Sequence, residues 1–191
     1  MNNFCRAVLV FIFVVGTSTT VNGDPISIEL TTIASGSLGA TNFTDAAVSI
    51  YGLGDTDDVL VSGSANLLRD NFLVTFEIDG VGSGQFTDTI QAVSNNNSDL
   101  GGFGNITQGF GLAFIQNSAF ATYDLQSSLD TVSGPANFVF GIPHETTEGS
   151  LRILSGSFGT FTASVGNNVP EPGSALAMAL VGTLFAFRRR R

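Results

Sequence analysis

Short runs in which apolar and polar residues alternate constrain this fold more than any other feature of the sequence. Between residues 24 and 168 there is no long helical periodicity, and β-forming runs are separated by clusters of Gly, Asn, Asp and Ser. Phe72–Ile78 is the clearest run, because its alternate residues are Phe, Val, Phe and Ile. Such a run buries one face of a strand and exposes the other. This pattern predicts an all-β fold, an antiparallel β-sandwich or its jelly-roll form.

The expected strands are rich in β-branched and aromatic residues, and most are bounded by turn residues. They are Ile26–Thr31, Val48–Tyr51, Val59–Ser62, Phe72–Ile78, Phe86–Val93, Phe110–Ile115, Phe120–Leu125, Asn137–Ile142, Leu151–Leu154 and Gly159–Val165. Glycine-containing stretches are interpreted as breaks between strands, namely Gly52–Asp55, Gly101–Gly102 and Ser133–Pro135. The phenylalanines at alternate strand positions are expected to fill a core between two sheets.

The charge of residues 24–168 argues against a partner that is itself an anion. Fifteen of the chain's 16 acidic residues and only two of its seven basic residues lie there, a formal charge of −13. Those two are Arg69 and Arg152, and the chain has no lysine. Such a surface repels nucleic acid, and it favours solubility and cation binding. A nucleic-acid function is therefore not expected.

The first 23 residues have the three parts of a secretory signal peptide. Met1–Arg6 carries one positive charge, Ala7–Val15 is apolar, and Gly16–Gly23 is small and polar. Cleavage is expected after Gly23. The only cysteine, Cys5, precedes the apolar run, so residues 24–168 contain neither a disulfide framework nor a thiolate metal site.

Residues for nucleophilic catalysis are scarce in the chain. The only histidine, His144, stands between Pro143 and Glu145 and is expected to be a satisfied or solvated loop residue. No serine has a glycine two residues away on each side, and without lysine there is no Walker A loop or Schiff base. A pair of carboxylates acting on a glycosidic bond stays open. The sequence favours a protein that is not an enzyme.

An acidic turn is the best local candidate for a metal site. Asp55, Asp57 and Asp58 lie close together after two glycines, and oxygen-rich loops suit calcium. A second oxygen-rich loop spans Asn95–Asp99. Neither has the spacing of an EF-hand or a calcium-binding repeat, so a solvated turn is the favoured interpretation. No cofactor is expected, with calcium at the three aspartates as the alternative.

The last residues combine an apolar run with a terminal block of positive charge. Ser174–Phe187 has no charged residue, and as a helix it would span about 21 Å, less than the ~30 Å hydrocarbon core. Arg188, Arg189, Arg190 and Arg191 follow it, and long arginine stems reach the headgroups. The pattern predicts a transmembrane helix with its arginines in the cytoplasm and the rest of the chain on the far side. The alternative, an amphipathic helix on the domain, needs a polar face that the run lacks.

Val169, Pro170, Glu171 and Pro172 precede this helix. Together the motif, the apolar run and the arginine block resemble a PEP-CTERM sorting signal over residues 169–191. The resemblance implies that exosortase, a membrane-embedded enzyme similar to cysteine proteases, processes the tail at the envelope of a Gram-negative bacterium. It also implies an association with exopolysaccharide and extracellular matrix. A GPI signal is the nearest rival, but its tail normally ends without a basic block.

The domain plan that follows is a signal peptide at 1–23, a secreted β domain at 24–168 and the sorting signal at 169–191. Phe43–Ala46 and Phe86–Asp88 also resemble the β-sandwich cargo of PEP-CTERM proteins, which implies no activity. Three functions stay open: a structural protein of the cell surface or matrix, an adhesion module that binds carbohydrate or calcium, and a hydrolase that uses carboxylates. We favour the first, with the adhesion module as the alternative.

Overall fold

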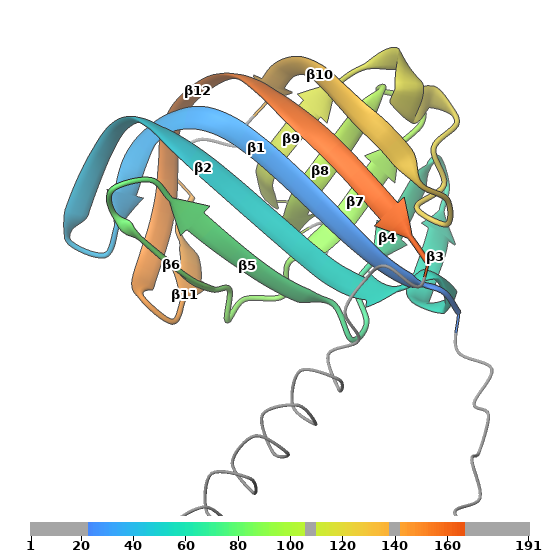
Figure 1. Cartoon of the computed structure of the whole chain (residues 1–191), viewed down its shortest axis with the longest axis horizontal. Helices are drawn as coiled ribbons and strands as arrows, with labels where there is room; N and C mark the ends of the chain where they lie inside the picture. Colours follow the sequence, from blue (N-terminus) through green and yellow to red (C-terminus); the bar gives the residue numbers. More distant parts are fainter. Residues whose placement is uncertain (1–22, 106–109, 138–141, 167–191) are drawn as a thin grey trace, which may run out of the picture.

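The computed structural model describes residues 23–105, 110–137 and 142–166, and these residues form an antiparallel all-β fold (Figure 1). The strands in chain order are β1 Pro25–Leu38, β2 Thr41–Asp55, β3 Val59–Ser62, β4 Ala65–Leu68, β5 Leu73–Ile78, β6 Gly82–Gln85, β7 Gln91–Asn95, β8 Leu100–Asn105, β9 Phe110–Gln116, β10 Leu129–Asn137, β11 His144–Thr146 and β12 Gly149–Val165. Two short 3-10 segments in these ranges are η1 Thr56–Asp58 and η3 Ser118–Ala121. The described segments contain no helix with the length and apolar character needed to cross a membrane.

The strands hydrogen bond into one sheet in the order β3-β4-β7-β8-β9-β10-β12-β1-β2-β5-β6, and β11 pairs with β12 off this path. Register shifts between Ala34 and Gly36 mark bulges on the long strand β1, and bulges bend a strand. The sheet curves so that β12, β1, β2 and β5 lie across the core from β7, β8 and β9 (Figure 1). The antiparallel all-β class is confirmed. The sandwich and its jelly-roll form are not confirmed, because the strands belong to a single continuous sheet.

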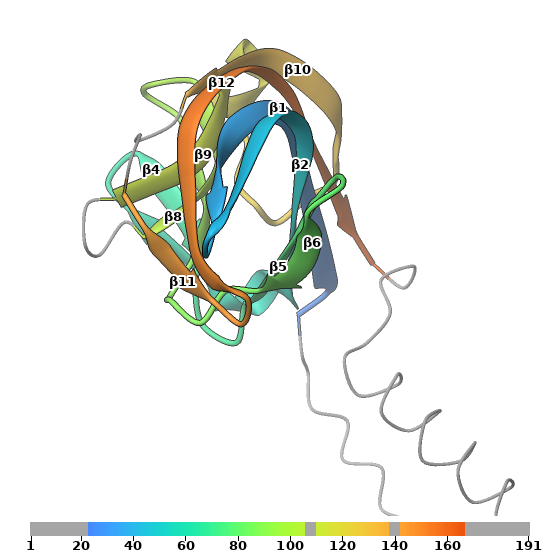
Figure 2. The same ribbon diagram turned by 90° about the vertical axis from the view of Figure 1, so that its left-hand side faces the viewer.

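The β6 end of this sheet is closed by β11. Phe86, just after β6, forms a bridge with Thr146 of β11, and the Thr147 N–H donates to the Gln85 carbonyl at 2.9 Å. The Thr87 N–H donates to the Glu145 carbonyl at 2.9 Å. Because β11 also pairs with β12, the strands β11, β12, β1, β2, β5 and β6 follow one another around the interior, as Figure 2 shows from that side.

The core is continuous across both halves of the sheet and is rich in aromatic rings. Phe120 and Phe161 are fully buried and meet edge to face, with ring centroids 5.1 Å apart. Phe76 and Phe86 meet in the same way at 5.3 Å. Edge-to-face aromatic pairs add stabilisation beyond the area they bury. The expectation that the phenylalanines fill the core is confirmed for these four residues.

Glycines inside strands make room for these rings, which corrects their interpretation as breaks. Gly101 lies within β8, and a Cβ there would overlap the Phe120 ring. Gly52 lies within β2, and a Cβ there would overlap the Phe72 ring. Gly134 lies within β10, where a Cβ would overlap the carbonyl oxygen of Gln116. A glycine inside a strand often marks such a close approach.

Two expected strands are wrong. Residues 120–125 begin in η3, because the Asn117 side chain accepts a hydrogen bond from the Ala119 N–H at 2.9 Å and caps this short helical turn. Tyr123 then offers its carbonyl to buried side chains rather than to a strand, including the Ser94 hydroxyl at 2.8 Å. Residues 86–93 form a bridge at Phe86, and strand β7 begins only at Gln91.

The start of β1 and the end of β12 lie side by side at one end of the fold. Ile26 near the start of β1 pairs with Val165 at the end of β12, and the Gly166 N–H donates to the Pro25 carbonyl at 3.0 Å. The predicted signal peptide and the tail are therefore attached at one end of the fold (Figure 1). The turns after β1, β5 and β11 lie toward the opposite end.

Candidate functional site

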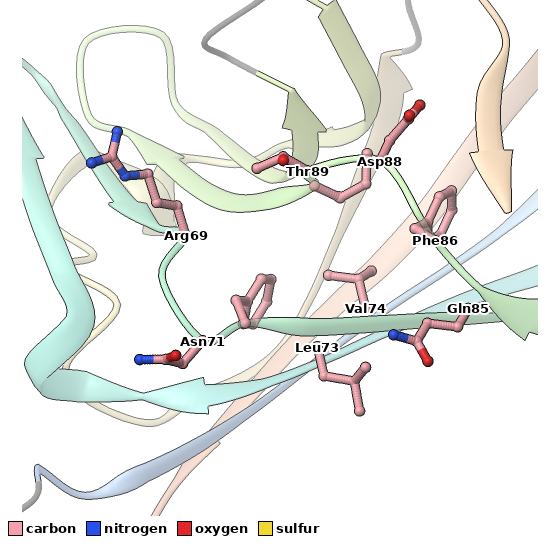
Figure 3. A pocket seen from close by; sticks show the side chains of 10 residues that line it. Arg69, Asn71, Leu73, Val74, Gln85, Phe86, Asp88 and Thr89 are labelled. Atoms are coloured by element: carbon pink, nitrogen blue, oxygen red, sulfur yellow. The ribbon is translucent and has the colours of Figure 1, made fainter.

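A groove of about 380 Å³ opens where the chain crosses twice between the two halves of the sheet. One crossing leads from β4 to β5, and the other leads from β6 to β7. The lining residues come from these crossings and from the adjoining strand ends (Figure 3): Arg69, Asn71, Phe72, Leu73, Val74, Gln85, Phe86, Asp88, Thr89 and Ile90. The groove combines polar groups at its rim with apolar side chains, and Val74, Phe86 and Ile90 are buried.

The polar side chains that line the groove use only part of their hydrogen-bonding capacity within the domain. Asp88 accepts a hydrogen bond from the Glu145 N–H at 2.8 Å. Asn71 has a φ of 51° and donates through its amide to Asp58 at 3.4 Å. Arg69 lies 3.4 Å from Asp70 in an exposed ion pair, an arrangement that contributes little stability. These side chains can therefore offer hydrogen bonds to a polar ligand.

The chemistry of the groove suits binding better than hydrolysis. Among the described residues Asp88 is the only carboxylate that lines it, whereas glycoside hydrolysis uses a pair. Amides, a hydroxyl and a guanidinium around apolar side chains resemble the mixed lining of ligand pockets.

His144 lies in β11 and is buried, with only 3% of its surface exposed, so the expectation of a satisfied or solvated loop residue is corrected to a buried strand residue. Its ring meets Phe86 edge to face, with centroids 6.4 Å apart. Its Nε2 atom is buried and has no hydrogen-bond partner in the described part of the chain. The neighbouring residue Pro143 does not predict the burial of His144, because this burial depends on β11 closing the sheet.

Burial lowers the pKa of His144 below the 6.5 of a free histidine. The negative charge of Asp88 and a hydrogen bond with the Gly111 backbone oppose this effect without reversing it. His144 is therefore neutral at pH 7. The neutral imidazole packs against Phe86 in the core.

The three candidate calcium ligands lie around η1. The Asp55 side chain accepts a hydrogen bond from the Asp57 N–H at 2.9 Å, which makes it the N-cap of this turn. Asp58 faces Asn71 instead, at 3.4 Å. In the described residues no three His, Cys, Asp or Glu side chains are grouped so that they could hold a metal ion. The structure thus gives Asp55 a capping role that needs no metal.

Several predicted features lie outside the described residues. They are residues 1–22 of the signal peptide predicted at 1–23, the sorting motif Val169–Pro172, the helix at 174–187 and the block Arg188–Arg191. Sequence reasoning missed the groove, although Arg69 offered a signal as one of only two basic residues between 24 and 168. The remaining lining residues carry no such signal, because they meet only through the fold.

The comparisons with known proteins identify the tail. Residues 168–191 match the family model described as a PEP-CTERM protein-sorting motif. No curated protein and no solved structure shows significant similarity to the chain. The match agrees with the resemblance drawn from Val169–Pro172 and the arginine block, and it implies sorting for export toward the cell surface by an exosortase-type enzyme. The chain therefore carries a PEP-CTERM sorting motif at its C-terminal end, attached to an antiparallel β domain.

Proposed function

We propose that this protein is an exported, non-catalytic structural component of the cell surface or extracellular matrix. The observation that carries the proposal is the sorting motif at residues 168–191, which follows directly on a β domain. Before processing, the helix at 174–187 holds the chain in the membrane, and the arginines after it stay in the cytoplasm. The β domain then stands on the outer side, within reach of the matrix.

The geometry of the domain supports this role. β1 and β12 pair along most of their lengths and bring both chain ends to one end of the fold. A domain tethered there presents its opposite turns away from the membrane. Its groove has one carboxylate, and its only histidine is packed against Phe86. These features favour a structural role over catalysis.

Mass spectrometry of the intact protein from its native host tests the proposal. In cells with active exosortase we expect a mature form that lacks the tail after the Pro-Glu-Pro motif. A strain without exosortase should retain the tail, and Glu171→Ala should reduce processing in the active strain while Glu148→Ala, in the β11–β12 turn, should not. An intact tail on envelope protein from exosortase-active cells would contradict the proposal.

The alternative is an adhesion module that binds carbohydrate, with exopolysaccharide as its partner. The groove favours it, because Asn71, Gln85 and Thr89 can bond sugar hydroxyls beside the Phe72 ring. Calcium-dependent binding through Asp55, Asp57 and Asp58 is the second form of this alternative. A higher melting temperature with host polysaccharide that is lost in Asn71→Ala would support the sugar form, and a rise with millimolar calcium would support the metal form. No change with either would leave the structural role alone.

A further inference from the structure

Strand β3 is an open edge of the sheet. β3 is the first strand of the hydrogen-bonded order and pairs with β4 alone, and the described residues contain no strand on its other side. Val61 is 74% exposed and Leu60 is 40% exposed. No residue of Val59–Ser62 is charged, and none is proline. Charged residues and proline are two of the features that keep natural edge strands from pairing with another strand.

The pairing with β4 shows which backbone groups of β3 are open. Ser62 and Ala65 face each other across a turn of only two residues, the arrangement of a hydrogen-bonded pair. Hydrogen-bonded residues alternate along a strand, so Leu60 and Ser62 direct their backbone groups toward β4. The Ser64 carbonyl agrees with this alternation, because it accepts from the Asn96 N–H on the β7 side of β4. Val61 therefore presents both its N–H and its C=O outward, and Val59 presents its C=O, because the Val59 N–H donates to the Thr56 carbonyl.

We propose that β3 pairs antiparallel with β3 of a second copy of this chain. The two-fold register centred on Leu60 keeps the paired residues Val59–Val61 within the strand. Val59 of each copy then lies opposite Val61 of the other, and the Val61 N–H donates to the Val59 carbonyl in both pairs. The two Leu60 side chains meet on the face of the strand opposite to that of Val59 and Val61. The same patch serves both copies, so the contact closes as a dimer.

Charges near β3 are compatible with this register. Asp58 falls opposite Ser62 of the other copy, and Asp57 falls opposite Gly63, so no carboxylate faces another across the pair. The formal charge of −13 on residues 24–168 still makes two copies repel. Salt screens this repulsion, so pairing should strengthen as ionic strength rises. If attraction between opposite charges dominated the interface, a rise in ionic strength would weaken the pairing instead.

A four-residue strand buries little area, so the contact is weak between free molecules. Tethering many copies to one surface raises their local concentration, which converts a weak contact into a useful one. The tethering of many copies to one surface rests on the proposed function, whereas the pairing of β3 strands does not. Self-pairing would give the structural role a mechanism, because each contact extends one sheet across two molecules.

Cysteine cross-linking of the purified full chain tests the register. In a Cys5→Ser background, Leu60→Cys places two thiols in a pair that lacks hydrogen bonds, with Cα atoms about 4.5 Å apart, inside the disulfide range. Ser62→Cys is the matched control, because the register separates its two copies by about 13 Å along the strand. We expect a disulfide dimer with Leu60→Cys, faster at high salt, and none with Ser62→Cys.

Val61→Pro supplies the second variant. It removes an outward N–H and leaves the β3–β4 hydrogen bonds in place, so it should abolish the Leu60→Cys cross-link without lowering the melting temperature much. Absence of a dimer with Leu60→Cys, or equal dimer with Ser62→Cys, overturns the proposal. A cross-link that survives Val61→Pro also overturns it. None of these outcomes depends on tail processing, so they are distinct from failure of the proposed function.

Discussion

The two edges of the sheet differ in whether their backbone groups are hydrogen bonded to another strand. At the β6 end, residues 85–88 hydrogen bond to β11, and Phe86 and His144 are packed beneath the closure. At the β3 end, a four-residue strand without charge leaves the backbone groups of Val61 and the carbonyl of Val59 directed outward. A sheet edge exposes backbone groups that another strand can bind. The difference indicates that one end serves the stability of the domain and the other is free for contacts.

Truncating Phe86 should have the largest effect. Phe86→Ala removes a buried ring that packs against Phe76 and His144, and we expect a loss of about 3–5 kcal/mol in the free energy of unfolding. Leu60→Ala at the open end is the control, because Leu60 is 40% exposed. Its loss should be well below that of Phe86→Ala. Urea unfolding of both variants measures this, and equal losses would remove the distinction between the ends.

Asp88 tests the closure through one hydrogen bond. Asp88→Asn replaces a charged acceptor of the Glu145 N–H, and we expect a loss of about 1.5–3 kcal/mol at most, since Asp88 is partly exposed. Asp57→Asn, near the open end, should change stability by no more than about 0.5 kcal/mol. Thermal unfolding at pH 7 compares the two variants. A larger loss for Asp57→Asn would contradict the assignment of the closed end.

The pH dependence of stability should report His144. Burial lowers the pKa of His144 in the folded state, so below pH 6.5 the unfolded chain binds a proton that the folded chain does not. Stability is therefore full above that pH and falls as the pH drops below it, by at most about 1.4 kcal/mol per pH unit. His144→Gln should flatten the fall between pH 7 and pH 5.5 in urea unfolding. An unchanged slope would show that the ring is not buried neutral.

Charging the open edge should have the smallest effect on stability. Val61→Lys places an ammonium on a side chain that is 74% exposed, so we expect a change within about 0.5 kcal/mol. The same change should prevent pairing between copies, which sedimentation of the full chain at high salt measures. A destabilised monomer would show that Val61 supports the domain itself.

The sequence predicts features that depend on neighbours along the chain. The bounds of β3 agree with the expected Val59–Ser62, and β5 begins one residue after the expected Phe72. The sorting motif is a local pattern of the same kind, and the family match confirms it. Alternation and short motifs need no knowledge of the rest of the fold.

Features that depend on distant contacts could not be predicted in this way. The sequence predicts a break at Gly101 because the neighbouring residues do not reveal the Phe120 ring that lies over it. It predicts a loop at His144 because β11 exists only through its pairing with β12 and with residue 86. The groove arises from two separate crossings of the chain, so only Arg69 gave a local sign of it. Tertiary packing decides each of these cases.

Hydrogen exchange resolved to single amides tests the contrast between the two ends most directly. At low concentration of the full chain we predict rapid exchange at Val61, and slow exchange at Thr87 and Thr147, whose N–H groups donate at 2.9 Å. At high concentration and salt, Val61 should become protected while Thr87 and Thr147 stay unchanged. Equal protection of all three amides at low concentration, or rapid exchange at Thr87 and Thr147, would contradict the account.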